Sequence, residues 1–111
     1  LLQALNQRIP EGGTSLHNAF AAAAGMRPRP DNILLLTDGL PTQGRQQTGA
    51  NTISGAERLK LFEEAVRFLP EAVPVNTILF PMEGDPLAAV SFWRLGMETR
   101  GSFLTPTRDW P

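Results

Sequence analysis

The chain has 111 residues, of which 41% are hydrophobic, enough for one modest core but not for two domains. The formal net charge is −1, with acidic and basic residues interspersed, so nothing in the charge favours a nucleic-acid partner. Cysteine is absent, which excludes a disulfide framework, a thiolate metal site and a cysteine nucleophile, and the localisation stays open.

The first residues predict a short helix. Leu1, Leu5 and Ile9 recur at helical spacing, and Pro10 followed by a glycine-rich turn ends the pattern. Because the chain opens on two leucines and a glutamine, which resemble neither a signal peptide nor a natural start, we expect a fragment. No apolar run is long enough to span a bilayer.

A second helix is predicted over residues 16–26. Thr14 and Ser15 offer side-chain oxygens just before it, and Leu16 and Phe20 begin its apolar stripe. Residues 32–37 then form a continuous apolar run that is typical of a strand buried on both faces of a parallel sheet. We therefore expect a central strand here, followed by a turn and a polar surface loop over residues 42–55.

The second half of the chain repeats the alternation of helix and strand. An amphipathic helix over residues 56–69 and a strand over 75–80 complete a βαβ unit with the first strand. Asp85 and Pro86 resemble the start of a helix over 87–99, which Arg100 and Gly101 end. Residues 102–105 predict a short edge strand. The fold class is thus α/β, with about three parallel strands and flanking helices in a single domain over residues 1–111.

Two turns carry the residues that suit a metal ion. Asp38 is the first residue after the strand predicted over 32–37, and ligands of open α/β sheets bind outside the carboxyl ends of strands. Thr14 supplies a hydroxyl in a glycine-rich turn at a helix start. A hydroxyl and a carboxylate suit a hard cation such as Mg²⁺. The competing interpretations are that Thr14 and Ser15 only cap a helix and that Asp38 only forms a turn with Gly39.

The order of these motifs resembles the von Willebrand factor type A (vWA) family. Gly-Gly-Thr-Ser-Leu at 12–16 is similar to the loop that contributes a threonine to the metal-ion-dependent adhesion site of that family. Ile-Leu-Leu-Leu-Thr-Asp-Gly-Leu-Pro-Thr at 33–42 resembles the segment whose aspartate completes the site, and residues 75–80 and 95–103 resemble the last strand, helix and strand. The resemblance covers essentially the whole chain and implies a three-layer, Rossmann-like vWA fold.

The chain departs from the family at one segment. It contains no Asp-x-Ser-x-Ser, which in the family supplies an aspartate and two serines to the metal, so only Thr14 and Asp38 match metal ligands. The resemblance implies Mg²⁺ or Mn²⁺ in the full-length parent, and two ligands predict weak or undetectable binding by this chain. Loss of the neighbouring first strand would expose the strand over 32–37, so we expect a homodimer or larger assembly.

Three classes of function follow from these observations. The resemblance implies a protein-binding module rather than an enzyme, in which the metal recognises an acidic residue of a protein partner and any membrane contact belongs to other parts of the parent. The alternative is a Mg²⁺-dependent hydrolase or phosphotransferase that uses Asp38, although no phosphate-binding loop accompanies it. The third is a structural fragment without activity. His17 stands alone among histidines and is not a candidate ligand, and Trp93 and Trp110 are interpreted as packing residues.

Overall fold

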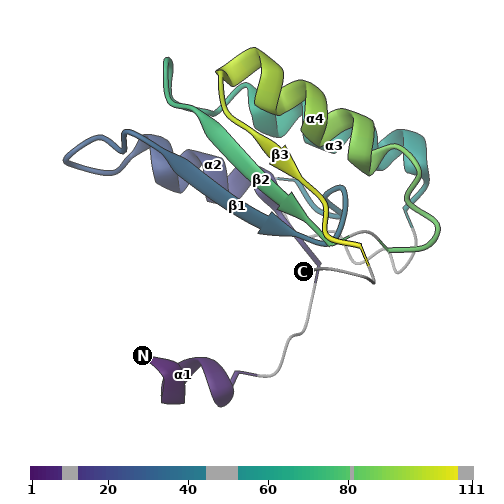
Figure 1. Ribbon diagram of the computed structural model, residues 1–111, viewed down its shortest axis with the longest axis horizontal. Coiled ribbons are helices and arrows are strands. Elements are labelled where there is room, and N and C mark those ends of the chain that lie inside the picture. Colours follow the sequence, from purple (N-terminus) through teal and green to yellow (C-terminus); the bar gives the residue numbers. More distant parts are fainter. Residues whose placement is uncertain (9–12, 45–52, 81, 108–111) are drawn as a thin grey trace.

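The computed structural model describes residues 1–8, 13–44, 53–80 and 82–107. Helices and strands alternate along most of them, which confirms the α/β class (Figure 1). The described elements are α1 (Leu2–Asn6), α2 (Leu16–Ala24), β1 (Ile33–Thr37), α3 (Gly55–Val66), β2 (Val75–Leu79), α4 (Ala88–Thr99) and β3 (Phe103–Leu104).

The three strands form one parallel sheet in the order β1-β2-β3. Leu36 lies beside Ile78 in the register of β1 and β2, and Ile78 lies beside Leu104 of β3. The sequence predicted all three strands and their parallel pairing. The third strand is shorter than expected, because only Phe103 and Leu104 have strand geometry.

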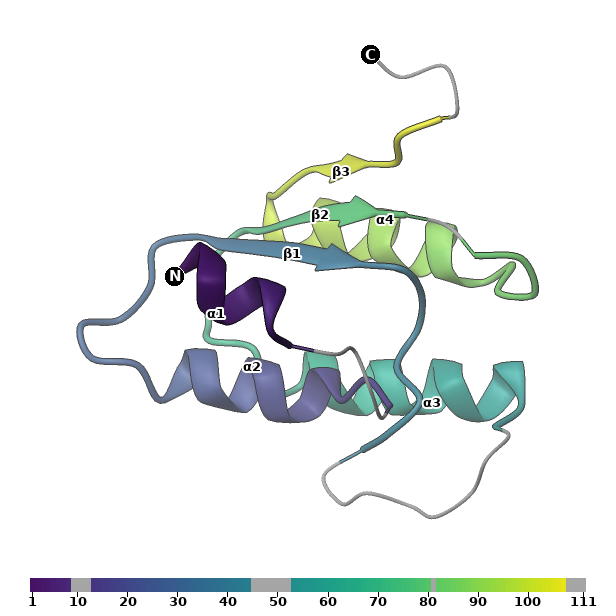
Figure 2. The ribbon, with the colours of Figure 1, turned by 90° about the horizontal axis from the view of Figure 1, so that it is seen from below.

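Helices α2, α3 and α4 cover one face of the sheet, and Figure 2 shows the sheet running above α2 and α3. The core lies between the two layers and includes Phe20 of α2, Phe62 of α3, Phe92 of α4 and Leu79 of β2. The rings of Phe62 and Phe92 meet edge to face with centroids 5.1 Å apart. Burial of these large side chains is the main stabilising contribution to the fold.

The other face of the sheet is apolar and open. Leu34 and Leu36 of β1 are 62% and 59% exposed. The prediction that this strand is buried on both faces is therefore wrong for this chain, because nothing among the described residues covers the second face. The described residues likewise form two layers and not the expected three. The side chains of the open face with substantial apolar exposure are Leu34, Leu36, Phe80 and Leu104.

Local capping determines where the helices begin and end. The Ser15 hydroxyl accepts a hydrogen bond from Asn18 N at 3.3 Å and begins α2. Ser54 and Glu57 form a capping box at the start of α3. Arg100, with φ of 60°, ends α4 in the left-handed conformation that is usual after a helix. The predicted helices are thus confirmed, with ends that shift by one to three residues.

Helix α1 stands apart from the sheet in Figure 1 and buries none of its residues. Leu2 and Leu5 are exposed, as is the preceding Leu1. The helical spacing was therefore predicted correctly as far as Asn6, whereas Ile9 and Pro10 lie outside the described residues. In the part of the chain that the structure describes, no helix combines the length and apolar character needed to cross a membrane.

Candidate functional site

Thr14 and Asp38 lie in turns next to the ends of two regular elements. Thr14 precedes the cap of α2, and Asp38 follows the last residue of β1. Both residues are exposed. Both candidate ligands are therefore accessible to solvent. Asp38 lies just beyond the carboxyl end of β1, which is where open α/β sheets bind ligands.

Hydrogen bonds join the turn of Thr14 to the loop that follows Asp38. The Thr14 carbonyl accepts from the backbone N–H groups of Thr42 and Gln43, each at 3.0 Å. Thr14 N donates to Thr42 Oγ1 at 3.0 Å, and Ser15 Oγ donates to Gly44 O at 2.7 Å. These four bonds connect segments about 30 residues apart in sequence, so the turn of Thr14 is fixed to residues 42–44, which follow the turn of Asp38.

The approach of the two turns depends on a small residue. A Cβ atom at Gly13 would lie 2.5 Å from Gln43 Nε2 and 2.6 Å from Thr42 Oγ1. Glycine is therefore the residue that fits without displacing these side chains. The glycine at position 13 therefore has a steric reason.

The turn around Asp38 is held by its neighbours. Thr37 Oγ1 donates to Gly39 O at 3.0 Å, Phe80 N donates to Thr37 O at 2.8 Å, and Leu40 is buried. Within the described residues, the Asp38 carboxylate has neither a hydrogen bond nor an ion pair. The turn is therefore held by the Thr37 hydroxyl and by backbone hydrogen bonds. Asp38 is exposed, and its carboxylate oxygens are free of these bonds as potential metal ligands.

The alternative roles in helix capping divide between two residues. Ser15 is the N-cap of α2, as the competing interpretation of helix capping predicted. The Thr14 hydroxyl, in contrast, makes no hydrogen bond within the described residues, and the residue acts through its backbone. A threonine hydroxyl without a structural partner and an unpaired carboxylate are the donors that a hard cation could use.

A second carboxylate reaches the same turn from another element, which the sequence did not predict. Asp85 Oδ2 accepts from Leu40 N at 2.7 Å and pairs with Arg58 Nη2 at 3.0 Å. The same Arg58 nitrogen donates to Leu40 O at 2.6 Å. The side chains of Arg58 and Asp85 are 21% and 5% exposed, so this ion pair is largely removed from water. The two side chains of this ion pair together bind both the N–H and the C=O group of Leu40.

These findings correct two interpretations. The amphipathic pattern over residues 56–69 predicts that Arg58 lies on the solvated face of the helix, but its long side chain reaches the Leu40 carbonyl after the end of β1. Asp85 was interpreted as a helix start, but α4 begins at Ala88 without a side-chain cap. The available signal was the position of Asp85 beyond the end of β2, where polar side chains face those that follow β1.

The described residues do not contain a fuller metal site. Among residues 1–8, 13–44, 53–80 and 82–107, no three His, Cys, Asp or Glu side chains gather as a group that could hold a metal ion. His17 lies against Phe68, with ring centroids 4.1 Å apart. Trp93 is half exposed rather than packed in the core, and Trp110 lies outside the described residues.

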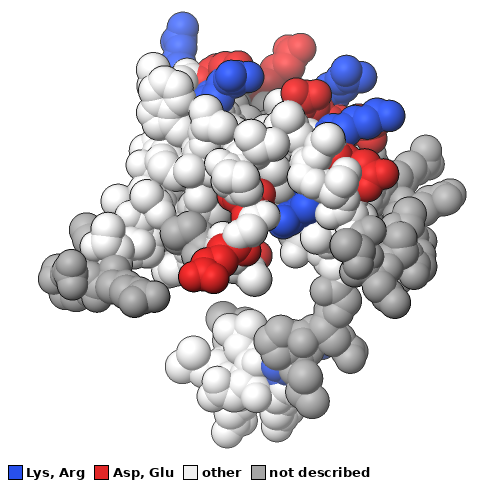
Figure 3. All heavy atoms as spheres, turned by 90° about the vertical axis from the view of Figure 1, so that its right-hand side faces the viewer, with Lys and Arg blue, Asp and Glu red and all other residues white. Residues whose placement is uncertain are grey.

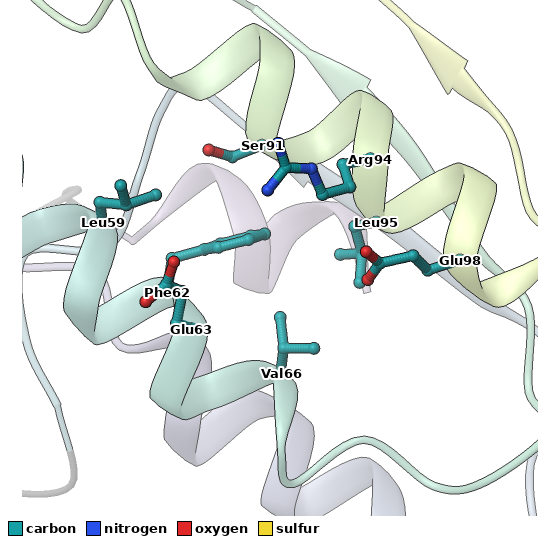
Figure 4. A pocket seen from close by; sticks show the side chains of 8 residues that line it. All are labelled: Leu59, Phe62, Glu63, Val66, Ser91, Arg94, Leu95 and Glu98. Atoms are coloured by element: carbon teal, nitrogen blue, oxygen red, sulfur yellow. The ribbon is translucent and has the colours of Figure 1, made fainter.

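A separate hollow lies between α3 and α4, away from the two turns (Figure 4). Phe62, Val66 and Leu95 line its apolar part, and Glu63, Arg94 and Glu98 add charges. Figure 3 shows acidic and basic side chains interspersed over one face of the molecule, without a large area of one sign. Neither feature indicates a particular ligand.

Comparisons with known proteins add no relative. No protein-family model, no curated protein and no solved structure matches the chain.

Proposed function

We propose that the chain is part of a protein-binding module of the von Willebrand factor type A kind, which recognises a partner through a divalent cation near Thr14 and Asp38. The observation that carries this proposal is the set of hydrogen bonds between Thr14 and the loop after Asp38. Those bonds fix the turn of Thr14 to residues 42–44, and both segments belong to the motifs whose sequences resemble the adhesion site. A parallel α/β sheet is the architecture that the resemblance implies.

The chemistry of the proposed site follows from its two donors. Thr14 Oγ1 and the Asp38 carboxylate would bind Mg²⁺ or Mn²⁺, and water would fill most of the remaining positions. An acidic side chain of a protein partner would replace one of those waters. Because the chain has no Asp-x-Ser-x-Ser segment, the site is incomplete and its affinity in this chain is expected to be weak.

Hydrolysis or phosphotransfer at Asp38 is less well supported. Such a reaction needs a second group that can accept a proton, and Asp85 is the carboxylate that reaches this turn. Its Oδ2 atom already accepts from Leu40 N and pairs with Arg58. Asp85 therefore has a structural task, and recognition remains the proposed role.

Calorimetric titration of Mg²⁺ and Mn²⁺ tests the proposal. We expect weak heat that disappears in the Thr14→Ala, Asp38→Ala double variant and persists in Asp31→Ala. Asp31 is a suitable control because it is an exposed carboxylate before the opposite end of β1. Adding an Asp-x-Ser-x-Ser segment, which the resemblance to the vWA family implies as a source of ligands, should strengthen binding. Equal heats from the wild type and the double variant would contradict the site.

We further propose that the chain associates with a second copy of itself. The exposed leucines of β1 lie on the open face of the sheet, so face-to-face packing covers them. Pairing through the β1 edge alone leaves the same side chains in water. The proposed assembly is therefore a homodimer through the sheet face.

A further inference from the structure

The turn that carries Asp38 is fixed from a distance by two charged side chains. Arg58 comes from the first turns of α3, and Asp85 comes from the segment between β2 and α4. Their contacts with Leu40 span 18 and 45 residues of sequence. The conformation of the backbone at Leu40, two residues after Asp38, therefore depends on α3 and on the segment between β2 and α4, which carry no candidate ligand.

Leu40, Arg58 and Asp85 each contact the other two residues. Leu40 N–H and C=O are both engaged, at 2.7 Å and 2.6 Å, and the two charged groups that engage them lie 3.0 Å apart. A Cβ atom on Gly39 would collide with Asp85 Oδ2 and lie 3.1 Å from Arg58 Nη2. The pair thus packs directly against the residue that follows Asp38, and only glycine leaves room for it.

We propose that Arg58 and Asp85 are positioning residues that hold the turn of residues 37–40 in one conformation and so keep Asp38 in place for the cation. This inference rests on the proposed cation site. Asp38 has no side-chain contact within the described residues to restrain it, so its position depends on the backbone on either side. Thr37 restrains that backbone before Asp38, and the ion pair restrains it after Gly39.

The ion pair also neutralises the positive charge of Arg58, which would otherwise repel a cation bound at this turn. Arg58 brings a positive charge to a turn that is proposed to hold Mg²⁺ or Mn²⁺. Because Asp85 lies against the same guanidinium nitrogen, that charge is matched by a carboxylate of opposite sign. Removing Asp85 alone should weaken cation binding both by loosening the turn and by leaving the positive charge of Arg58 unmatched. Removing Arg58 alone should also loosen the turn, but it leaves the negative charge of Asp85, which favours a cation, so binding should weaken less.

The test combines two NMR measurements on the whole chain. Amide hydrogen exchange of Leu40 reports the turn, with Thr77 N–H in the sheet as internal reference. Line broadening of the Thr14, Asp38 and Gly39 amides by added Mn²⁺ reports the cation even when binding is weak. The variants are Asp85→Ala, Arg58→Met and Gly39→Ala, and the last of these alters no charge.

Asp85→Ala removes the acceptor of Leu40 N and should speed exchange of Leu40 about tenfold while that of Thr77 changes little. Arg58→Met and Gly39→Ala keep that acceptor but disturb its position, so they should speed exchange of Leu40 by a smaller factor. The Mn²⁺ concentration needed for broadening should rise most in Asp85→Ala. Asp85→Asn keeps an acceptor for Leu40 N and should restore most of the exchange protection. Arg67→Met, an exposed arginine at the end of α3, is the matched control and should change neither measurement.

The outcomes separate the two proposals. Unchanged Leu40 exchange in all three variants overturns the positioning role. Faster exchange with unchanged Mn²⁺ broadening also overturns it, and leaves the cation site standing. If Mn²⁺ broadens none of the three amides in the wild type, the cation site itself fails, and the role of the pair fails with it. Should Asp85→Ala not fold, Gly39→Ala and Arg58→Met still decide the question.

Discussion

Gly101 lies directly against the backbone of Val75, so that a methyl group at Gly101 would overlap the Val75 carbonyl. The contact joins the end of α4 to the start of β2. Gly101 N also donates to Gly96 O at 2.8 Å, which closes the helix. Only hydrogen fits at the Gly101 Cα, because the neighbouring atoms belong to the backbone and cannot rotate away.

Gly101→Ala should therefore destabilise the fold strongly. We expect a loss of about 3 kcal/mol in the free energy of unfolding, at the upper end of overpacking costs, because β2 must move. Chemical denaturation followed by circular dichroism measures this loss. Gly55→Ala is the control: nothing lies within 4 Å of its added Cβ, and it should cost nothing. Similar losses in both variants would contradict the steric explanation.

The capping box of α3 provides a second test. Ser54→Ala removes the oxygen that accepts from Glu57 N at 3.2 Å and should cost about 1 kcal/mol of unfolding free energy. Glu57→Gln keeps an oxygen for Ser54 N and should cost less than half as much. Denaturant midpoints of the two variants compare these losses. A larger loss in Glu57→Gln would mean that charge, not capping, stabilises this end of the helix.

Removing one member of the ion pair should cost more than removing a surface charge. Arg58→Met leaves Asp85 nearly buried with only Leu40 N as a partner, and we expect a loss of about 3 kcal/mol, the low end for buried pairs because Arg58 is 21% exposed. Thermal unfolding of Arg58→Met and Arg67→Met at equal ionic strength provides the measurement. A loss below that of the Arg67 variant would show that the pair contributes little to stability.

The strands and helices could be predicted because their signals are local. The apolar run at 33–37, the stripe of α3 and the stop at Arg100 each depend on residues close in sequence. The position of β1 within the sheet could not be predicted in the same way. A continuous apolar run suits a strand covered on both faces, but whether a second layer is present depends on other residues, and Leu34 and Leu36 are left exposed.

The candidate site shows the same division. The positions of Thr14 and Asp38 next to regular elements follow from chain order. The contacts of Arg58 and Asp85 with Leu40 join three separate segments, and no spacing rule connects them. Helical periodicity indicates where the Cβ atom of Arg58 points, but its long side chain can cover much of the surface around it. Such contacts emerge only from the packed structure.

Self-association through the open face is the last prediction, and its strength can be estimated. Four side chains on each copy are about half exposed, and covering each should contribute roughly 1 kcal/mol. Two copies then gain about 8 kcal/mol, against an association cost of at least about 4 kcal/mol. The remainder corresponds to a Kd of about 1 mM or weaker.

Sedimentation velocity at rising concentration up to the millimolar range should therefore show an increasing average mass. Leu34→Thr with Leu36→Thr should abolish that increase, because threonine suits a strand but removes most of the apolar surface. Leu2→Thr with Leu5→Thr is the matched control, since these leucines are at least as exposed as those of β1 but lie on α1. If the α1 variant loses association and the β1 variant keeps it, the interface is formed by α1 and the sheet face has no part in it.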